Sequence, residues 1–164
     1  MSGNGDLSRR ALLAGLAACP LVLAGAPARA SAELPKMVVM KDPSCGCCGA
    51  WIDHVRAAGF PVEVIDSGEM DRHKRRLGVP AALASCHTAQ VGGYVVEGHV
   101  PAAEIERLLA ERPQAVGLAA PGMPVGSPGM EVPGMAPDSY DLVLFGPSGQ
   151  SRFARYRGDE RLSG

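Results

Sequence analysis

The hydrophobic and polar positions of this chain change period repeatedly, and each change marks an expected element. An apolar run at 36–42, bounded by prolines, predicts a buried strand. Over 45–60 the spacing becomes helical, because Trp51 and Val55 recur on one face and Gly59 is a natural helix end. The pattern therefore predicts a strand that leads directly into a helix.

Two further elements follow the first helix. The segment 61–66 alternates apolar and polar residues, which predicts a second strand. The charged segment 69–78 predicts a short helix with Met70 and Leu77 facing inward.

A hairpin and a third helix are expected next. We predict a strand over 81–85, a turn at the glycine pair 92–93 and a returning strand over 94–98. Apolar residues at helical spacing, with a proline near each end, predict a helix over 101–113.

The rest of the chain has a different character. Three Pro-Gly-Met repeats lie between 121 and 135, in a stretch without periodicity, and we expect a loop there. The segments "YDLVLFG" and "SRFARYR", separated by "PSGQ", predict a closing hairpin whose position in the sheet cannot be read from the pattern.

The order of these elements indicates an α/β protein. A cysteine motif at the first helix and a proline before the third strand make the chain similar to the thioredoxin-like fold. We therefore expect a thioredoxin-like mixed sheet flanked by helices, with a Pro-Gly-Met loop and a C-terminal hairpin. The expected organisation is a leader over 1–30, a metal-binding domain over 36–146, and a C-terminal strand and tail over 147–164.

The N-terminal segment predicts export. A pair of arginines at 9–10 precedes an apolar run and a small-residue ending at Ala30, which resembles a twin-arginine leader. Such a leader implies a periplasmic protein with no membrane span after processing. The box "LAAC" at Cys19 also suits a lipoprotein, but the apolar run continues beyond it, which favours the cleaved leader.

Charge and composition remove some functional classes. The whole chain has a formal charge of −1, and loss of three arginines and one acid with the leader gives −3 for residues 31–164. A chain without excess positive charge has no electrostatic footprint for nucleic acid.

Four cysteines remain after the leader, and three of them, Cys45, Cys47 and Cys48, stand within four positions. A thiol at a helix N-terminus ionises more easily, and the thiolate is both nucleophile and metal ligand. The spacing of Cys45 and Cys48 suits redox disulfides, zinc sites and iron–sulfur sites alike. Cys47 favours a soft metal such as Cu(I), because a redox dithiol has no use for a third sulfur.

Other candidate ligands lie later in the chain. Cys86 and His87 would approach the cysteine cluster if the third strand runs beside the first helix. Met123 and Met130 end two of the Pro-Gly-Met repeats, where a thioether suits a soft metal, although they also suit a loop that covers the sheet. The remaining histidines are weaker candidates: His54, His73 and His99.

Taken in order, the segments "CGCCGAW", "GVP", "SCHTAQVGGYVVEGHVPA", "LLAERP" and "GLAAPGMPVGSPGME" resemble the CopG-like family of periplasmic copper-resistance proteins. The resemblance implies that Cys45, Cys47 and Cys48 bind copper as a thiolate-bridged cluster, aided by Cys86. It also implies a role in copper handling, with Cu(I)/Cu(II) interconversion as a further activity.

We therefore expect an exported protein that binds copper ions as Cu(I), in a site able to hold several ions. It would be a binder or redox partner rather than a turnover enzyme, and its partners would be other periplasmic copper-handling proteins. The alternative is a periplasmic thiol-disulfide oxidoreductase with Cys45 as nucleophile and Cys48 as resolving thiol. A copper chaperone would differ only in its partner.

Overall fold

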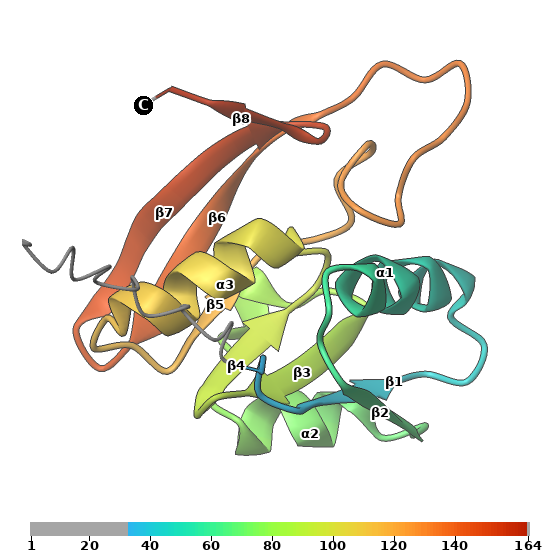
Figure 1. Ribbon diagram of the computed structural model, residues 1–164. Coiled ribbons are helices and arrows are strands. Elements are labelled where there is room, and N and C mark those ends of the chain that lie inside the picture. Colours follow the sequence, from blue (N-terminus) through green and yellow to red (C-terminus); the bar gives the residue numbers. More distant parts are fainter. Residues whose placement is uncertain (1–32, 164) are drawn as a thin grey trace, which may run out of the picture. The chain divides into compact units, whose positions relative to one another are not determined.

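The computed structural model describes residues 33–163, which form an eight-stranded mixed sheet in the order β2-β1-β3-β4-β5-β6-β7-β8 (Figure 1). The strands are β1 (Met37–Lys41), β2 (Val62–Asp66), β3 (His87–Val91), β4 (Tyr94–Glu97), β5 (Gly117–Ala119), β6 (Ser139–Gly146), β7 (Gly149–Arg157) and β8 (Glu160–Leu162). The helices are α1 (Gly46–Ala57), α2 (Met70–Arg76) and α3 (Ala102–Glu111), with a 3₁₀ turn η1 at Ala81–Leu83. The expected leader, over 1–30, and Cys19 lie outside the described residues.

The first half of the sheet confirms the predicted α/β order. Strands β1 and β2 are parallel, β3 is antiparallel to β1, and β4 is antiparallel to β3. The β3–β4 hairpin closes at Gly92 and Gly93, which both have positive φ, as expected for a tight two-residue turn. Helices α1 and α3 lie on one side of this half and α2 on the other (Figure 1).

The second half contains two strands that the pattern did not predict. The three-residue β5 pairs in parallel with β4 and connects the first half to the C-terminal strands. The predicted closing hairpin is confirmed as β6 and β7, and β6 pairs with β5. A second three-residue strand, β8, pairs with β7 at the edge of the sheet.

The strand expected over 81–85 is wrong, because this segment begins with the 3₁₀ turn η1. Pro80 caps the turn, and the alanines after it offer no β-branched side chains to a sheet. The strand starts instead at His87, where pairing with β1 begins. His87 therefore occupies a buried strand position.

Helix α2 faces the sheet differently from the prediction. Met70 and Leu77 were expected to face inward, but both are only half-buried. The buried residue of the helix is Lys74, which is 7% exposed. A charged side chain occupies this position because a buried carboxylate, Glu97, receives it.

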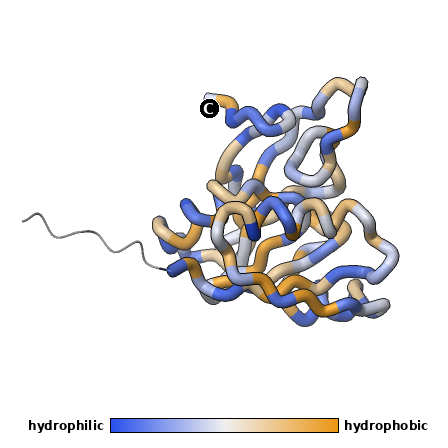
Figure 2. Tube along the Cα trace, turned by 45° about the vertical axis from the view of Figure 1, so that its right-hand side comes forward, coloured by the Kyte–Doolittle hydropathy of each residue, from blue (hydrophilic) through white to orange (hydrophobic). Residues whose placement is uncertain are grey.

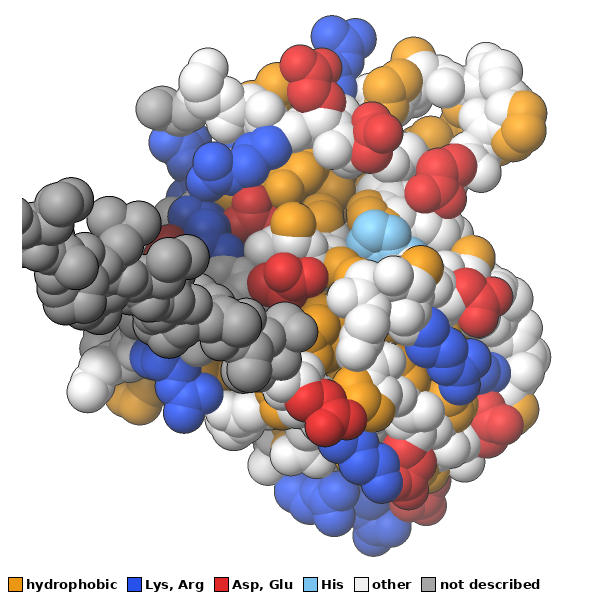
Figure 3. Space-filling view, viewed as in Figure 1, with side chains coloured by type: hydrophobic (Ala, Val, Ile, Leu, Met, Phe, Trp, Pro, Cys, Tyr) orange, Lys and Arg blue, Asp and Glu red, His pale blue; other side chains and the backbone are white. Residues whose placement is uncertain are grey.

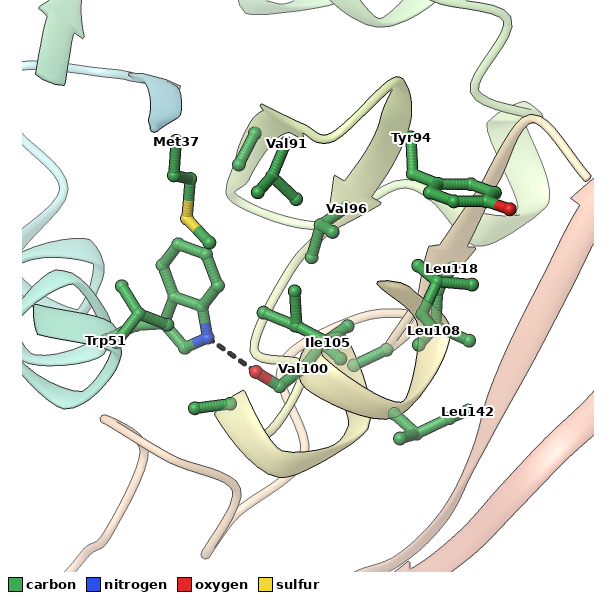
Figure 4. Close-up of a cluster of buried hydrophobic side chains, with 14 of the residues drawn as sticks. Met37, Trp51, Val91, Tyr94, Val96, Val100, Ile105, Leu108, Leu118 and Leu142 are labelled. Atoms are coloured by element: carbon green, nitrogen blue, oxygen red, sulfur yellow. Dashed lines mark hydrogen bonds between the residues drawn. The ribbon is translucent and has the colours of Figure 1, made fainter. Parts of the chain in front are cut away.

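The core between the sheet and helices α1 and α3 is continuous (Figure 4). Helix α1 contributes Trp51, which is fully buried beside Met37, and α3 contributes Ile105 and Leu108. The indole Nε1 of Trp51 donates a hydrogen bond to the carbonyl oxygen of Val100 at 2.9 Å. This bond fixes α1 against the connection from β4 to α3, on the side of the sheet where the cysteines lie.

Hydrophobic and hydrophilic residues alternate along the trace in short stretches (Figure 2). This pattern suits strands and helices that each bury one face. Among residues 33–163, no helix has the length and apolar character needed to cross a membrane.

Candidate metal centre

A tight turn places the cysteine motif at the start of α1. After β1 the carboxylate of Asp42 accepts a hydrogen bond from the backbone N–H of Ser44 at 2.8 Å, and the N–H of Cys45 donates to the carbonyl of Asp42 at 3.0 Å. Cys45 is the N-cap of α1, and Cys47 and Cys48 lie in its first turn. This arrangement confirms the predicted strand-to-helix junction at the motif.

The structure brings four sulfur atoms together. One ligand atom from each of Cys45, Cys47, Cys48 and Cys86 lies within 4.8 Å of the others. Cys45 and Cys48 form a disulfide with a Cα–Cα distance of 5.6 Å, and Cys47 and Cys86 are free thiols. The Sγ of Cys47 lies 3.5 Å from that of Cys45 and 4.0 Å from that of Cys86, so it stands between the two segments.

Two buried histidines extend the cluster on the side of β3. The Sγ of Cys86 lies 3.2 Å from Nδ1 of His87 and 3.0 Å from Nε2 of His99, and these three residues form a second group of closely spaced donor atoms. Nδ1 of His99 lies 2.8 Å from the carbonyl oxygen of Pro128. Because a carbonyl only accepts, Nδ1 carries the proton, and the lone pair of Nε2 faces Cys86.

The ring of His87 is held by its surroundings. Its centroid lies 4.2 Å from that of Trp51 and 5.0 Å from that of His99. Its Nε2 is buried without a hydrogen-bond partner in the described part of the chain. Burial, followed by the charges of His99 and Lys74, holds the pKa of His87 well below its usual value, which keeps the imidazole neutral and able to bind a metal.

The protonation of Cys86 depends on its environment. Burial, and next the neighbouring Cys47, raise the pKa of the Cys86 thiol to about 12. In the absence of a bound cation this thiol therefore stays protonated at neutral pH. A bound cation reverses this preference, because it stabilises the thiolate directly.

The segment between β5 and β6 passes next to α1. Gly129 has a φ of 81°, and a Cβ at this position would lie 2.6 Å from the backbone nitrogen of Trp51. Only glycine allows this close approach. The contact brings the segment beside the helix that carries the cysteines, and Pro128 bonds to His99 from the same stretch.

The two candidate methionines lie differently on this segment. Met130 follows Gly129 and is half-buried. Met123 is 55% exposed, and its neighbour Gly122 receives a hydrogen bond from the hydroxyl of Ser85, just before Cys86. Hydrophobic side chains are visible on the surface of the molecule (Figure 3), and Met135, further along the same segment, is 57% exposed. Met130 thus follows the glycine that contacts α1, and the side chain of Met123 is largely exposed to solvent.

His99 is a weaker candidate from the sequence, and the structure places it beside Cys86. It lies before α3, is fully buried, and faces Cys86. The other two histidines have local partners: Nε2 of His54 accepts the backbone N–H of Ala102 at 3.0 Å, and Nε2 of His73 pairs with the hydroxyl of Ser67 at 2.9 Å.

The donor set is compatible with metal binding. Four sulfurs with two neutral imidazoles nearby match the ligand preference of soft cations such as Cu(I), and offer nothing to cations that prefer oxygen. Zinc accepts the same atoms, but three sulfurs from one turn allow bridging between several ions, which a single tetrahedral zinc does not need.

Known proteins similar to this chain are consistent with the geometry. The family model described as "Protein of unknown function, DUF411" matches residues 83–130, which contain Cys86, both buried histidines and two Pro-Gly-Met repeats. Two solved structures, forms 1 and 2 of the copper resistance protein CopG, each have 48% sequence identity to this chain and a TM-score of 0.71. The matches cover 76% of this chain and 99% of form 2, and 77% and 100% for form 1. None of the curated proteins matches the chain.

Proposed function

The chain belongs to the CopG family of copper resistance proteins, and from this premise we propose that it binds copper as Cu(I) through Cys45, Cys47, Cys48 and Cys86. The observation that carries the proposal is the gathering of these four donor atoms within 4.8 Å of one another. Once the Cys45–Cys48 disulfide is reduced, all four sulfurs can act as thiolates, which Cu(I) prefers, and sulfurs this close can bridge two or more ions.

The neighbouring side chains extend the proposed site. His87 and His99 supply imidazole nitrogens beside Cys86, and Met123 and Met130 supply thioethers from the segment that passes α1. Nitrogen ligands suit Cu(II) as well as Cu(I). The mixed donor set therefore suits copper in both oxidation states, as Cu(I)/Cu(II) interconversion at this site with an external one-electron donor or acceptor would require.

A copper titration of the reduced chain tests this proposal. Cu(I) is added anaerobically against a chromophoric Cu(I) chelator, and bound metal and free thiols are counted. Uptake of at least one Cu(I) per chain, with loss of titratable thiol, is expected. Uptake of less than one Cu(I) per chain would remove the basis of the proposal.

Cys47→Ser is the most selective variant for this purpose. A four-ligand metal site contributes about 10–16 kcal/mol in zinc peptides, so one lost thiolate costs about 3 kcal/mol, or roughly a hundredfold in affinity. Cys47 is not part of the Cys45–Cys48 disulfide, so thiol exchange should survive the substitution. Equal copper affinity in Cys47→Ser and the parent would contradict the assignment.

The thioether ligands have a matched control. Met123→Leu and Met130→Leu should each weaken Cu(I) binding, whereas Met135→Leu should not, although Met135 is as exposed as Met123. If all three variants bind Cu(I) with the affinity of the parent chain, Met123 and Met130 are not ligands.

The Cys45–Cys48 disulfide favours a second candidate function, thiol–disulfide exchange. Its Cα–Cα distance of 5.6 Å is in the ordinary range for a disulfide, and Cys47 lies beside it as a free thiol. An insulin-reduction assay separates the two functions. Metal-independent turnover that disappears in Cys45→Ser supports exchange, and its absence leaves copper binding as the function.

We also infer that the first half of the chain is thioredoxin-like and acts in the periplasm. The parallel β1–β2 pair followed by the antiparallel β3–β4 hairpin supports the fold, and the arginine pair of the expected leader over 1–30 supports the location. The physiological partners would then be other copper-handling proteins of that compartment. Fractionation of cells that express the full chain tests the location, and export should fail when Arg9 and Arg10 are replaced by lysine.

A further inference from the structure

A buried ion pair lies directly behind Cys86. Nζ of Lys74, on α2, is 2.5 Å from Oε1 of Glu97, at the end of β4, and 2.9 Å from the hydroxyl of Thr88. The hydroxyl of Thr88 donates to Oε2 of Glu97 at 2.7 Å. The carboxylate is fully buried, and we call these three residues the Lys74–Glu97 network.

The network holds the backbone on both sides of Cys86 and His87. Oε1 of Glu97 accepts the backbone N–H of Ser85 at 2.6 Å, and Ser85 precedes Cys86. Thr88, which follows His87, is itself a member. Cys86 and His87, the two donors at the start of β3, thus lie between two residues that are hydrogen-bonded to the same carboxylate.

Stability alone does not explain such a pair. Taking two charges out of water costs about as much as their attraction returns, and apolar residues of similar size are often equally stabilising at such positions. An apolar replacement cannot supply an acceptor for the N–H of Ser85, and a glutamine supplies only a neutral amide oxygen, which binds Lys74 and the Ser85 N–H less strongly than a carboxylate. A Cβ on Gly98 would lie 2.6 Å from the side chain of Ser85, so the residue after β4 approaches this segment closely.

We propose that Glu97, held by Lys74 and Thr88, is a positioning residue for the metal site, and that it fixes Cys86 at the distance from Cys47 that joint binding of one cation requires. This inference rests on the proposed copper-binding function. Side chains that hydrogen-bond behind metal ligands change metal affinity by roughly 10- to 100-fold when they are replaced.

Glu104 provides a matched control. It is also buried, at 3% exposed, and is bound by the side chains of Arg107, Arg161 and Tyr156. Glu97→Gln and Glu104→Gln both remove one buried negative charge with little change of shape. Only the first of them changes a group bonded to the segment that carries Cys86.

The first measurement is Cu(I) affinity in the full, reduced chain, by competition with a chromophoric chelator, together with the melting temperature of the metal-free protein. Glu97→Gln should lower affinity roughly 10- to 100-fold and change the copper–thiolate absorption spectrum. Glu104→Gln should lower the melting temperature without either change. Unchanged affinity and spectrum in Glu97→Gln would overturn the proposal, because the network would then only stabilise the fold.

A milder pair covers the case in which Glu97→Gln does not fold. Thr88→Val removes the hydroxyl that supports the carboxylate, and Thr88→Ser keeps it. Affinity should fall in Thr88→Val and be restored in Thr88→Ser. Equal affinity in the two variants counts against the network.

A metal-free measurement separates this inference from the proposed function. In a chain whose other four cysteines are replaced by serine, the rate at which a disulfide reagent labels Cys86 reports its position directly. That rate should change several-fold with Glu97→Gln and stay constant with Glu104→Gln. If the parent chain binds no copper but the labelling rates still differ, the copper function fails and the positioning role stands; equal rates remove the positioning role.

Discussion

Replacing Trp51 by phenylalanine tests how strongly α1 is fixed to the rest of the fold. The indole is fully buried and donates to the carbonyl of Val100, which is itself fully buried. Phenylalanine has no donor, so this carbonyl loses its hydrogen bond, at a cost of about 1–3 kcal/mol. The smaller ring also leaves about 40 Å³ empty, which at about 24 cal/mol per Å³ adds about 1 kcal/mol.

We therefore expect Trp51→Phe to lower the free energy of unfolding by about 2–4 kcal/mol. Urea denaturation followed by far-ultraviolet circular dichroism measures this, because the variant has no tryptophan fluorescence. Tyr140→Phe is the matched control: its hydroxyl donates to the carbonyl of Gly158 at 3.0 Å, so it loses a similar bond with almost no change in volume. A loss in Trp51→Phe no greater than that in Tyr140→Phe would refute the reasoning.

Two further predictions concern the contacts around α1. Burial lowers the pKa of His54, although the charge of Glu131 opposes the shift, and the neutral Nε2 accepts the N–H of Ala102. Because the folded pKa is depressed, the contribution of His54 to stability is complete above the unfolded pKa of about 6.5 and is lost as the pH falls from there through the lower folded pKa. His54→Gln should flatten the decline in unfolding free energy between pH 7.5 and 5, and parallel curves for variant and parent would contradict this. Gly129→Ala should detach its segment from α1 and raise its rate of limited proteolysis, whereas Gly134→Ala, at the same φ of 81° but with no atom within 4 Å, should carry only the backbone strain. Equal proteolysis rates in the two variants would show that the contact does not hold the segment.

Local patterns were sufficient to predict two features of the first half of the fold. The strand-to-helix junction at Cys45 and the β3–β4 hairpin each depend on a few consecutive residues, and the structure confirms both. The short strands β5 and β8 could not be predicted, because three residues carry almost no periodicity and their pairing depends on distant neighbours.

Two predictions in the first half are wrong. Met70 and Leu77 were expected to face inward instead of Lys74, since nothing near Lys74 in the sequence reveals a buried carboxylate on another element. The strand expected over 81–85 was placed too early because apolar alanines fit a strand and a 3₁₀ turn equally well. For Lys74 the deciding contact is therefore tertiary.

His99 could have been found from the sequence. The Gly92–Gly93 turn pairs Val91 with Tyr94, and in an antiparallel hairpin every step back along one strand is a step forward along the other. Five such steps place Cys86 opposite His99. The Sγ of Cys86 and Nε2 of His99 lie 3.0 Å apart, as this register predicts.

The sulfur cluster joins parts of the chain that are far apart in sequence, since Cys47 and Cys86 are separated by 39 positions. A cation held by both would act as a reversible cross-link between α1 and β3. Its binding energy would then add to folding, by about 4 kcal/mol when free metal exceeds the dissociation constant a thousandfold. A chain of this design would be most resistant to unfolding when copper is abundant, which is the condition in which a resistance protein is needed.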